Sequence, residues 1–391
     1  GMDRFCQFFR CPTFDKEMVD REVRAIDSEH NNNVPIDGRR LNQVFKRGLR
    51  SDHPGSGFST GNLETLLPPS RSTDELHEAL VKFRSTWYRT DRMTLAVQGT
   101  QSLDELEKMV VDTGFGEIEG MNDGSVAESA MEAAEAVKAG KKVRSDVPRF
   151  KYGNGNPFTI TEGDETSEPG PGLDGGVAGV MRWVVPVNDR REVSLVFPLD
   201  GAADQDGKPH RYVTHCLGHE GPGSLLDILQ AKGWAESVSA GVSLMNDDCH
   251  AFKLGVQLTE AGEANLDSVL DLVFETLALM REVPTDEALC NEMAAMAQME
   301  FTYQDQVAAN RYVSRLASNL YDYEPASVLS GPVLIDPKAI TEGVKATTDR
   351  LTPSNAIITV SSTAVKKRYE EAVAAGPDSA AAKEWSTERW Y

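Results

Sequence analysis

The chain has 391 residues, of which 40% are hydrophobic, and its formal net charge is −21. This length is enough for two ordinary domains, and the hydrophobic content is that of a folded protein. The acidic charge argues against a nucleic-acid partner and against anionic membrane surfaces, both of which attract basic faces. No run of about 18 apolar residues occurs, so we expect no membrane span.

The cysteines form no recognisable metal or disulfide framework. Their number is odd, and they stand at Cys6, Cys11, Cys216, Cys249 and Cys290. An odd count with irregular spacing favours free thiols in a reducing compartment. We therefore expect a cytoplasmic location.

The first part of the chain, residues 1–125, predicts helices and one strand. Two of the helices begin at Ser-x-x-Glu capping boxes, which start at Ser72 and Ser102. Apolar spacing predicts helices at 14–31, 72–88 and 102–112 and a strand at 93–98. The Ala- and Glu-rich residues 126–149 are interpreted as a connector to a second domain, residues 150–391.

The second domain predicts a sheet with helices around it. Its acidic, Gly- and Pro-rich residues 161–178 are interpreted as a loop insertion. Strands are expected at 181–187, 193–198, 234–245, 249–258 and 356–361. Helices are expected at 209–217, 223–231, 261–282, 285–320, 339–349 and 363–374. Strands and helices together predict an α+β fold.

The two parts of the chain resemble each other. Each ends in a helix, a short polar turn, an apolar strand and another helix, at 83–112 and at 340–373. We interpret this pattern as an internal duplication. A Pro-Thr pair opens an earlier long helix in each copy, at Pro12 and at Pro284. Because far more chain precedes the second pair, the first copy is expected to be truncated by roughly 120 residues.

Two carboxylates mark the helix predicted at 14–31. Glu22 and Glu29 are two helical turns apart and therefore only ~20° apart around the helix axis. The apolar side chains within ~60° of Glu22 are Met18, Val19, Ala25 and Ile26. The pair is thus expected in the middle of a buried stripe, where a carboxylate is costly unless it is paired or binds a metal. The pattern predicts a metal ligand, a salt bridge to an Arg or Lys of the fold, or an amphipathic face whose buried side is assigned wrongly here.

Residues 20–30, DREVRAIDSEH, resemble the zinc-site helix of the insulysin and pitrilysin family of metallopeptidases, the inverzincins with an HxxEH motif. Further similar segments are STGN at 59–62, LGHEGPGSLL at 217–226, AKGW at 231–234 and STERWY at 386–391. The resemblance covers most of the chain, as the later part of domain one plus domain two. It implies duplicated α/β domains, each with a mostly antiparallel sheet flanked by helices.

The resemblance also implies roles for particular residues. Glu29 matches the family's third zinc ligand, and Glu22 matches a nearby carboxylate that orients the site. The two histidine ligands and the general base belong to HxxEH, and none of the seven histidines here stands in that motif. The family's second domain holds an exosite that grips peptides by strand addition, and the matching residues are His215, Gly218, Val238, Ala240 and Val242.

The chain departs from the family at several of these positions. Val238, Ala240 and Val242 stand where insulysins have Leu, Gly and Gln. Arg39 and Asn42 stand where insulysins have aromatic residues near the catalytic cleft. These changes indicate an altered substrate preference or altered domain contacts.

We therefore expect part of a zinc metalloendopeptidase that degrades peptides. Its partners would be peptide substrates and the remaining domains of the parent polypeptide. Because this chain lacks HxxEH, it is expected to be inactive alone and to bind zinc weakly or not at all. The alternative is a non-catalytic peptide-binding or partner subunit of the same family, which the changed exosite residues favour.

Overall fold

A computed structural model describes residues 1–49, 54–90, 93–118, 158, 179–200, 208–246 and 249–374. The chain divides into two compact units. Unit 1 comprises residues 1–30, 60–150 and 298–334, and unit 2 comprises residues 31–59, 151–297 and 335–391. The predicted connector 126–149 and the insertion 161–178 lie outside the described residues, as do the boundaries at 125 and 150.

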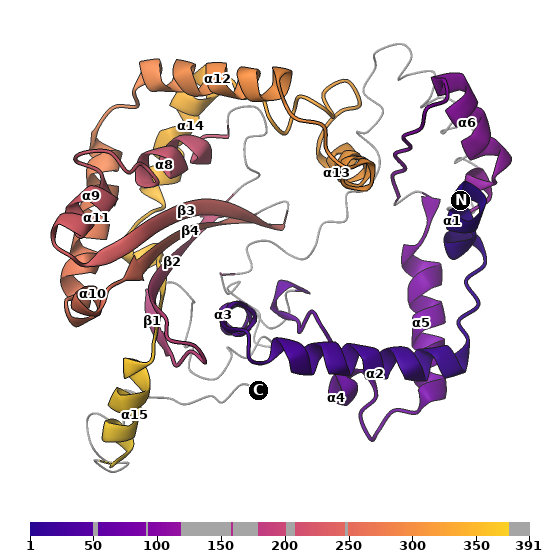
Figure 1. The fold of residues 1–391 in the computed structure, drawn as a ribbon, viewed down its shortest axis with the longest axis horizontal. Helices are drawn as coiled ribbons and strands as arrows, with labels where there is room; N and C mark the ends of the chain where they lie inside the picture. Colours follow the sequence, from indigo (N-terminus) through magenta and orange to yellow (C-terminus); the bar gives the residue numbers. More distant parts are fainter. Residues whose placement is uncertain are drawn as a thin grey trace, which may run out of the picture. The chain divides into compact units, whose positions relative to one another are not determined.

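Unit 2 is built on a five-stranded sheet with the strand order β1-β5-β2-β4-β3 (Figure 1). Its strands are β1 (Val180–Val184), β2 (Arg191–Asp200), β3 (Ala235–Asn246), β4 (Cys249–Leu258) and β5 (Ile357–Ser362). β1 and β5 pair in parallel, and all the other neighbours pair antiparallel. The predicted α+β class, with a mostly antiparallel sheet flanked by helices, is confirmed.

Helices cover one face of this sheet and close the main core of unit 2 (Figure 1). They are α8 (His210–Leu217), α9 (Leu225–Ala231), α10 (Glu260–Ala264), α11 (Leu266–Glu282), α12 (Glu287–Thr302) and α14 (Pro337–Asp349). Alternate residues of β2 and β4, such as Leu195 and Leu254, point into this layer and are completely buried. Successive side chains of a strand point to opposite faces of the sheet, so every second residue is expected to be buried here. The short helix η4 (Pro353–Asn355) precedes β5, and α15 (Ala364–Ala374) follows it.

The opposite face of the sheet carries a smaller apolar cluster. Here α3 (Asp37–Lys46) brings Phe45 and the following Leu49 against Val196 and Ile357. Arg182 of β1 donates a hydrogen bond from Nη1 to the Val44 carbonyl oxygen at 3.3 Å. The short helix η1 (Pro54–Ser56) completes this part of unit 2.

All the regular secondary structure that the structure describes in unit 1 is helical. Its elements are α1 (Met2–Arg10), most of α2 (Lys16–Asn33), α4 (Leu63–Leu66), α5 (Thr73–Trp87), α6 (Leu103–Asp112), η3 (Phe115–Glu117) and α13 (Ala309–Asp322). Both predicted capping boxes are present, because Ser72 and Ser102 exchange hydrogen bonds with Glu75 and Glu105. Burial is limited to two small clusters, one around Phe115 and one around Val23.

The prediction of a strand at 93–98 was wrong, because the structure describes no strand there. Residues 93–99 have no regular secondary structure, although the matching segment of the second copy forms β5. Among the described residues of unit 1 no strand is available to pair with this segment. A strand exists only as a partner of another strand, so apolar alternation alone could not produce one.

The long helix predicted at 285–320 is two helices, α12 and α13. α12 ends at Thr302 and α13 begins at Ala309, and the passage from unit 2 into unit 1 falls at residue 298, within α12. The segment after α2 makes the reciprocal passage, because residues 31–59 belong to unit 2. Each copy therefore places the segment that follows its first long helix in the other unit. No described helix is long and apolar enough to cross a membrane.

Candidate functional site

Helix α2 is held in unit 1 through one apolar edge. Val19 and Val23, one turn apart, are buried against Leu76 of α5. Leu66 and Leu80 pack around the same contact. Spacing of i and i+4 places both valines on one side of the helix, which is the side that meets α4 and α5.

Polar contacts fix the same helix along its length. Asp27 Oδ1 accepts a hydrogen bond of 2.8 Å from the Leu63 amide at the start of α4. Near the other end, the Lys16 ammonium pairs with Asp74 at 2.6 Å. The His77 ring, through Nε2, lies 2.7 Å from the Phe14 carbonyl oxygen. These contacts determine which side of α2 is left open.

Glu22 and Glu29 lie on the open side. Both side chains are exposed, together with Met18 and Ala25, so the expectation of a buried stripe around Glu22 was wrong. The buried edge is rotated toward Val23, because the leucines of α4 and α5 meet that edge. Positions 18, 22, 25 and 29 follow the i, i+4, i+7, i+11 spacing of a single face. The two carboxylates thus share one face that packing leaves free.

The described residues do not assemble a complete metal site. Neither Glu22 nor Glu29 forms an ion pair or hydrogen bond with another described residue. No three His, Cys, Asp or Glu side chains of the described chain come together in a group that could hold a metal. A catalytic zinc needs three protein ligands, and the residues that the structure describes offer only a single carboxylate ligand on this face.

The sequence-predicted exosite residues lie on β3 and α8 of unit 2. β3 is the last strand of the sheet, so its outer edge has no strand partner among the described residues. Val238, Ala240 and Val242 are half-buried and pack toward the helical core. His215 is exposed in the last turn of α8, and Gly218 is the C-cap residue of that helix. The structure therefore brings the predicted residues onto two elements that contact each other.

His215 and His219 do not form a metal pair. Their rings stack with centroids 6.5 Å apart, and both side chains are exposed. Gly218 ends the helix between them, so the two rings are not presented by one continuous helical face. The glycine also permits a tight helix end, since a Cβ there would lie 3.0 Å from the Thr214 carbonyl oxygen.

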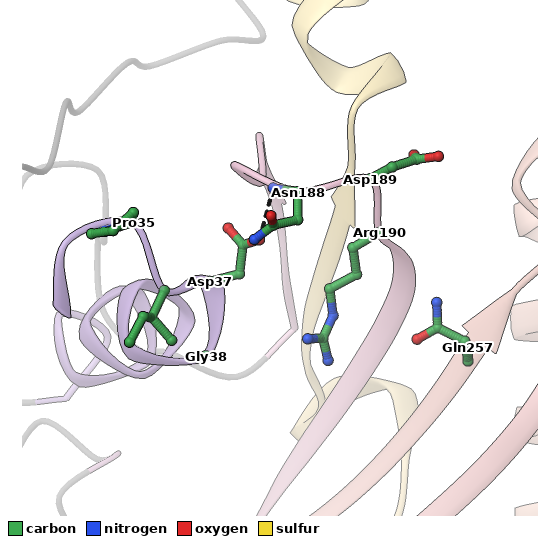
Figure 2. Close-up of a pocket in the computed structure, with 8 residues that line it drawn as sticks. Pro35, Asp37, Gly38, Asn188, Asp189, Arg190 and Gln257 are labelled. Carbon is green, nitrogen blue, oxygen red and sulfur yellow. Dashed lines mark hydrogen bonds between the residues drawn. The ribbon is translucent and has the colours of Figure 1, made fainter. Parts of the chain in front are cut away.

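One functional candidate was missed in the sequence. Asp37, in the first turn of α3, is the one acidic side chain that is buried among the described residues. Its carboxylate accepts hydrogen bonds from the Val187 amide at 2.7 Å, the Asn188 amide at 3.0 Å and Asn188 Nδ2 at 3.0 Å (Figure 2). An Asp in a first helical turn looks ordinary, and its partners lie about 150 residues away.

The surroundings of Asp37 favour the ionised form of its carboxyl group. Burial by itself would raise the pKa of its carboxyl group. The hydrogen bonds from Val187 and Asn188, helped by the charge of Arg40, outweigh burial and lower the pKa below its usual value. Asp37 and Asn188 line an open pocket of about 470 Å³, to which Arg190 and Gln257 also contribute (Figure 2).

Comparisons with known proteins place the chain among metallopeptidases. It is 30% identical over 361 residues to an Arabidopsis thaliana protein described as insulin-degrading enzyme-like 1, peroxisomal, covering 91% of this chain and 32% of that protein. It is 29% identical over 393 residues to human insulin-degrading enzyme, covering 100% of this chain and 33% of that enzyme. This chain thus spans about a third of the length of these curated relatives.

Structural similarity agrees with this placement. The crystal structure of pitrilysin matches with a TM-score of 0.71 and 26% identity, covering 93% of this chain and 34% of pitrilysin. The family profile of the peptidase M16 inactive domain matches residues 76–296, and the profile of the middle or third domain of peptidase M16 matches residues 301–391. The chain belongs to the M16 peptidase family.

Proposed function

We propose that this chain is part of a zinc metalloendopeptidase that hydrolyses peptides. The observation that carries the proposal is the open face of α2, where Glu22 and Glu29 are both exposed and unpaired with any described residue. Of the two other interpretations, a structural salt bridge would need a basic partner that the described residues do not provide, and a wrongly assigned amphipathic face agrees with the exposure of both side chains. A free carboxylate on a well-anchored helix is suited to ligate a metal.

In this proposal Glu29 would be a zinc ligand and Glu22 would orient a neighbouring ligand. Zinc, when bound, would polarise the scissile carbonyl and lower the pKa of a bound water. The two histidine ligands and the general base would come from an HxxEH helix in the parent polypeptide. The role of α2 is to hold the carboxylates still, which its contacts with Leu63 and Asp74 achieve.

β3 would dock the peptide by strand addition. Backbone N–H and C=O groups along an edge strand can pair with an extended peptide whatever its side chains. The methyl group of Ala240 packs toward the helical core and therefore does not obstruct the free edge. His215 and Gly218, at the end of α8, would line the same docking surface.

Replacing Glu29 in the full-length parent tests this function. We expect Glu29→Gln to lower kcat/KM on a quenched fluorescent peptide by about 10³-fold, since loss of zinc removes several kcal/mol of transition-state stabilisation. Glu17→Gln, at another exposed carboxylate of α2, is the matched control and should retain activity. A Glu29→Gln parent that is as active and as chelator-sensitive as the wild type would refute the role of Glu29.

The 391-residue chain alone is proposed to bind zinc weakly and to hydrolyse nothing, because one carboxylate cannot hold the ion. Titration calorimetry checks this directly. Tight binding of one zinc per chain would show that residues outside the described part supply further ligands. A cytoplasmic, reducing compartment suits the five free cysteines, and burial raises the pKa of the Cys6 thiol further from reactivity.

A non-catalytic peptide-binding subunit is the second candidate, favoured by the changed residues of the β3 edge. The two candidates differ in one measurement on the parent. A binding subunit would hold long peptides saturably and show no chelator-sensitive hydrolysis, whereas the peptidase would do both.

A further inference from the structure

Asp27 gives the half of α2 that carries Glu29 a directional contact with another segment. In the first half, Val19 and Val23 meet the leucines of α4 and α5. Asp27 lies one turn beyond Val23, and its Oδ1 accepts a hydrogen bond of 2.8 Å from the Leu63 amide. Apolar contacts have no preferred direction and tolerate small shifts of a helix along its axis, whereas a hydrogen bond fixes the distance between two atoms.

The segment that donates this hydrogen bond, residues 60–66, is itself braced. Gly61 has a φ of +80°, in the left-handed region that favours glycine, and a Cβ there would lie 3.3 Å from Leu66 Cδ1. Asn62 and Thr65 form a capping box, with hydrogen bonds of 2.9 Å and 3.0 Å. Leu66 packs against the apolar edge of α2. The donating amide is therefore presented at a fixed place.

The donor and the acceptor suit each other chemically. Leu63 is the first residue of α4, and the amide at such a position has no carbonyl partner within its own helix. A carboxylate forms a stronger hydrogen bond with it than a neutral acceptor would. Asp27 stands two residues before Glu29 and ~140° around the helix axis from Glu22. It therefore holds α2 from a side that leaves the face of the two glutamates open.

We infer that Asp27 is a positioning residue for Glu29. Its bond to Leu63 fixes α2 along its axis at the turn in which Glu29 stands, and so fixes where that carboxylate meets the metal. All the residues that take part belong to unit 1. The inference rests on the proposed function for the role of Glu29, but the effect of the bond on α2 can be tested without zinc.

Hydrogen exchange of the 391-residue chain, followed by mass spectrometry, tests the bond. Asp27→Ala removes the acceptor, and exchange in residues 24–30 should become about tenfold faster, the effect of losing one hydrogen bond to a charged group. Asp20→Ala is the matched control, because Asp20 lies two turns earlier on the same side of the helix and pairs with Arg24 of α2 itself at 3.1 Å. The control should change exchange by less than about twofold, since exposed pairs of this kind stabilise little.

Leu63→Pro removes the donor and leaves Asp27 intact. Proline lacks the amide hydrogen but is favoured at the first position of a helix, and the extended backbone of Asn62, with φ −155°, suits the residue before a proline. The Leu63 side chain is 43% exposed, so little packing is lost. This variant separates the bond from every other contact of Asp27, and it carries the test if Asp27→Ala fails to fold.

Leu63→Pro should also speed exchange in residues 24–30 by about tenfold, and the double variant should exchange no faster than the single ones, because both changes remove the same bond. Unchanged exchange in Leu63→Pro would overturn the inference. So would multiplied effects in the double variant, which would show that the two changes act through different contacts.

Zinc binding by the full-length parent provides the second measurement. Asp27→Ala and Leu63→Pro should each raise the zinc dissociation constant by about tenfold, with little change in KM, as the loss of an orienting contact does. Asp27→Asn keeps an oxygen acceptor and should recover most of the affinity, and Asp20→Ala should match the wild type.

The outcomes separate the inference from the proposed function. Wild-type zinc affinity in both variants, with faster exchange in residues 24–30, would overturn the link to Glu29 and leave the proposed function standing. A parent that binds no zinc even as wild type would refute the proposed function, and the positioning role with it.

Discussion

The two units contain matching elements in different states. In unit 2, β5 lies between β1 and β2, and Val360 is 1% exposed. In unit 1, the matching residues 93–99 pair with no described strand, and Leu95 is 40% exposed. The helices on either side form equally well in both units. Helices therefore arise from local sequence, whereas a strand depends on neighbours that are far away in the chain.

The two units also differ in how far the apolar faces of their helices are buried. Leu103 of α6 is 84% exposed and Phe83 of α5 is 55% exposed, although both belong to predicted amphipathic helices. In unit 2 the corresponding apolar faces, such as that of α11, are buried against the sheet. In the described part of unit 1, the apolar faces of α5 and α6 are therefore left uncovered. In unit 2 the corresponding faces are covered by a β-sheet.

The largest expected difference between the units is the loss of stability when a phenylalanine is replaced by alanine. Phe252 is completely buried in unit 2, so Phe252→Ala should lower the free energy of unfolding by about 3–5 kcal/mol. Phe83→Ala, at an exposed ring of unit 1, should cost less than about 1 kcal/mol. Urea denaturation followed by tryptophan fluorescence measures both. Equal losses would show that unit 1 is as well packed as unit 2.

Lowering the pH should reduce the free energy of unfolding of unit 2 because of His210. Burial, with the positive charges of His250, Arg211 and Lys208, lowers the pKa of His210 to about 4. Between about pH 6.5 and pH 4 the unfolded chain binds a proton at this residue that the folded chain does not. Stability should therefore fall as the pH drops through this window, by at most about 3 kcal/mol.

His210→Gln should flatten that slope, measured as the urea midpoint at several pH values. His219→Gln, at an exposed histidine of the same unit, is the control. An unchanged slope in His210→Gln would remove His210 as the cause.

A pair of valines tests the comparison directly. Val360→Ala in β5 should cost about 2 kcal/mol, the transfer of the lost methyl groups plus a cavity. Val97→Ala, at the matching position of unit 1, should cost less than about 0.5 kcal/mol in the 391-residue chain. In the longer polypeptide proposed above, the two costs should converge if residues 93–99 gain strand partners there. If Val360→Ala still cost much more stability than Val97→Ala there, the interpretation of an internal duplication would be contradicted.

The smallest difference is expected at helix caps. Ser102 in unit 1 and Ser224 in unit 2 accept hydrogen bonds from the amides of Glu105 and Asp227, at 3.3 Å and 3.1 Å. Replacing either serine by alanine should cost about 1 kcal/mol of local stability, since a cap acts within its own turn. Hydrogen exchange in α6 and α9 measures this. A large difference between the two variants would show that even local contacts depend on the unit.

The sequence predicted most of what is local. The capping boxes at Ser72 and Ser102 located two helices, and apolar segments located β4 and β5. The spacing of Glu22 and Glu29 correctly placed both on one face of α2. Which face of α2 is buried could not be predicted, because that depends on the leucines of α4 and α5.

Features that depend on contacts between distant parts of the chain could not be predicted from the sequence. The passage of residues 31–59 and 298–334 into the opposite units leaves no periodic signal. Asp37 finds its partners in a turn that no pattern near residue 37 could indicate. The edge position of β3 likewise follows from strand order and not from its own residues.

The exchange of segments has a consequence for synthesis on the ribosome. Asp37 leaves the ribosome about 150 residues before Asn188, its partner. At roughly 5–20 residues per second, α3 waits on the order of ten to thirty seconds before its docking turn exists. During that interval Phe45 and Leu49 have nothing of their own sheet to cover them. The nascent chain thus exposes the apolar side chains of Phe45 and Leu49 for that interval, and slowing translation before residue 188 should increase its misfolding.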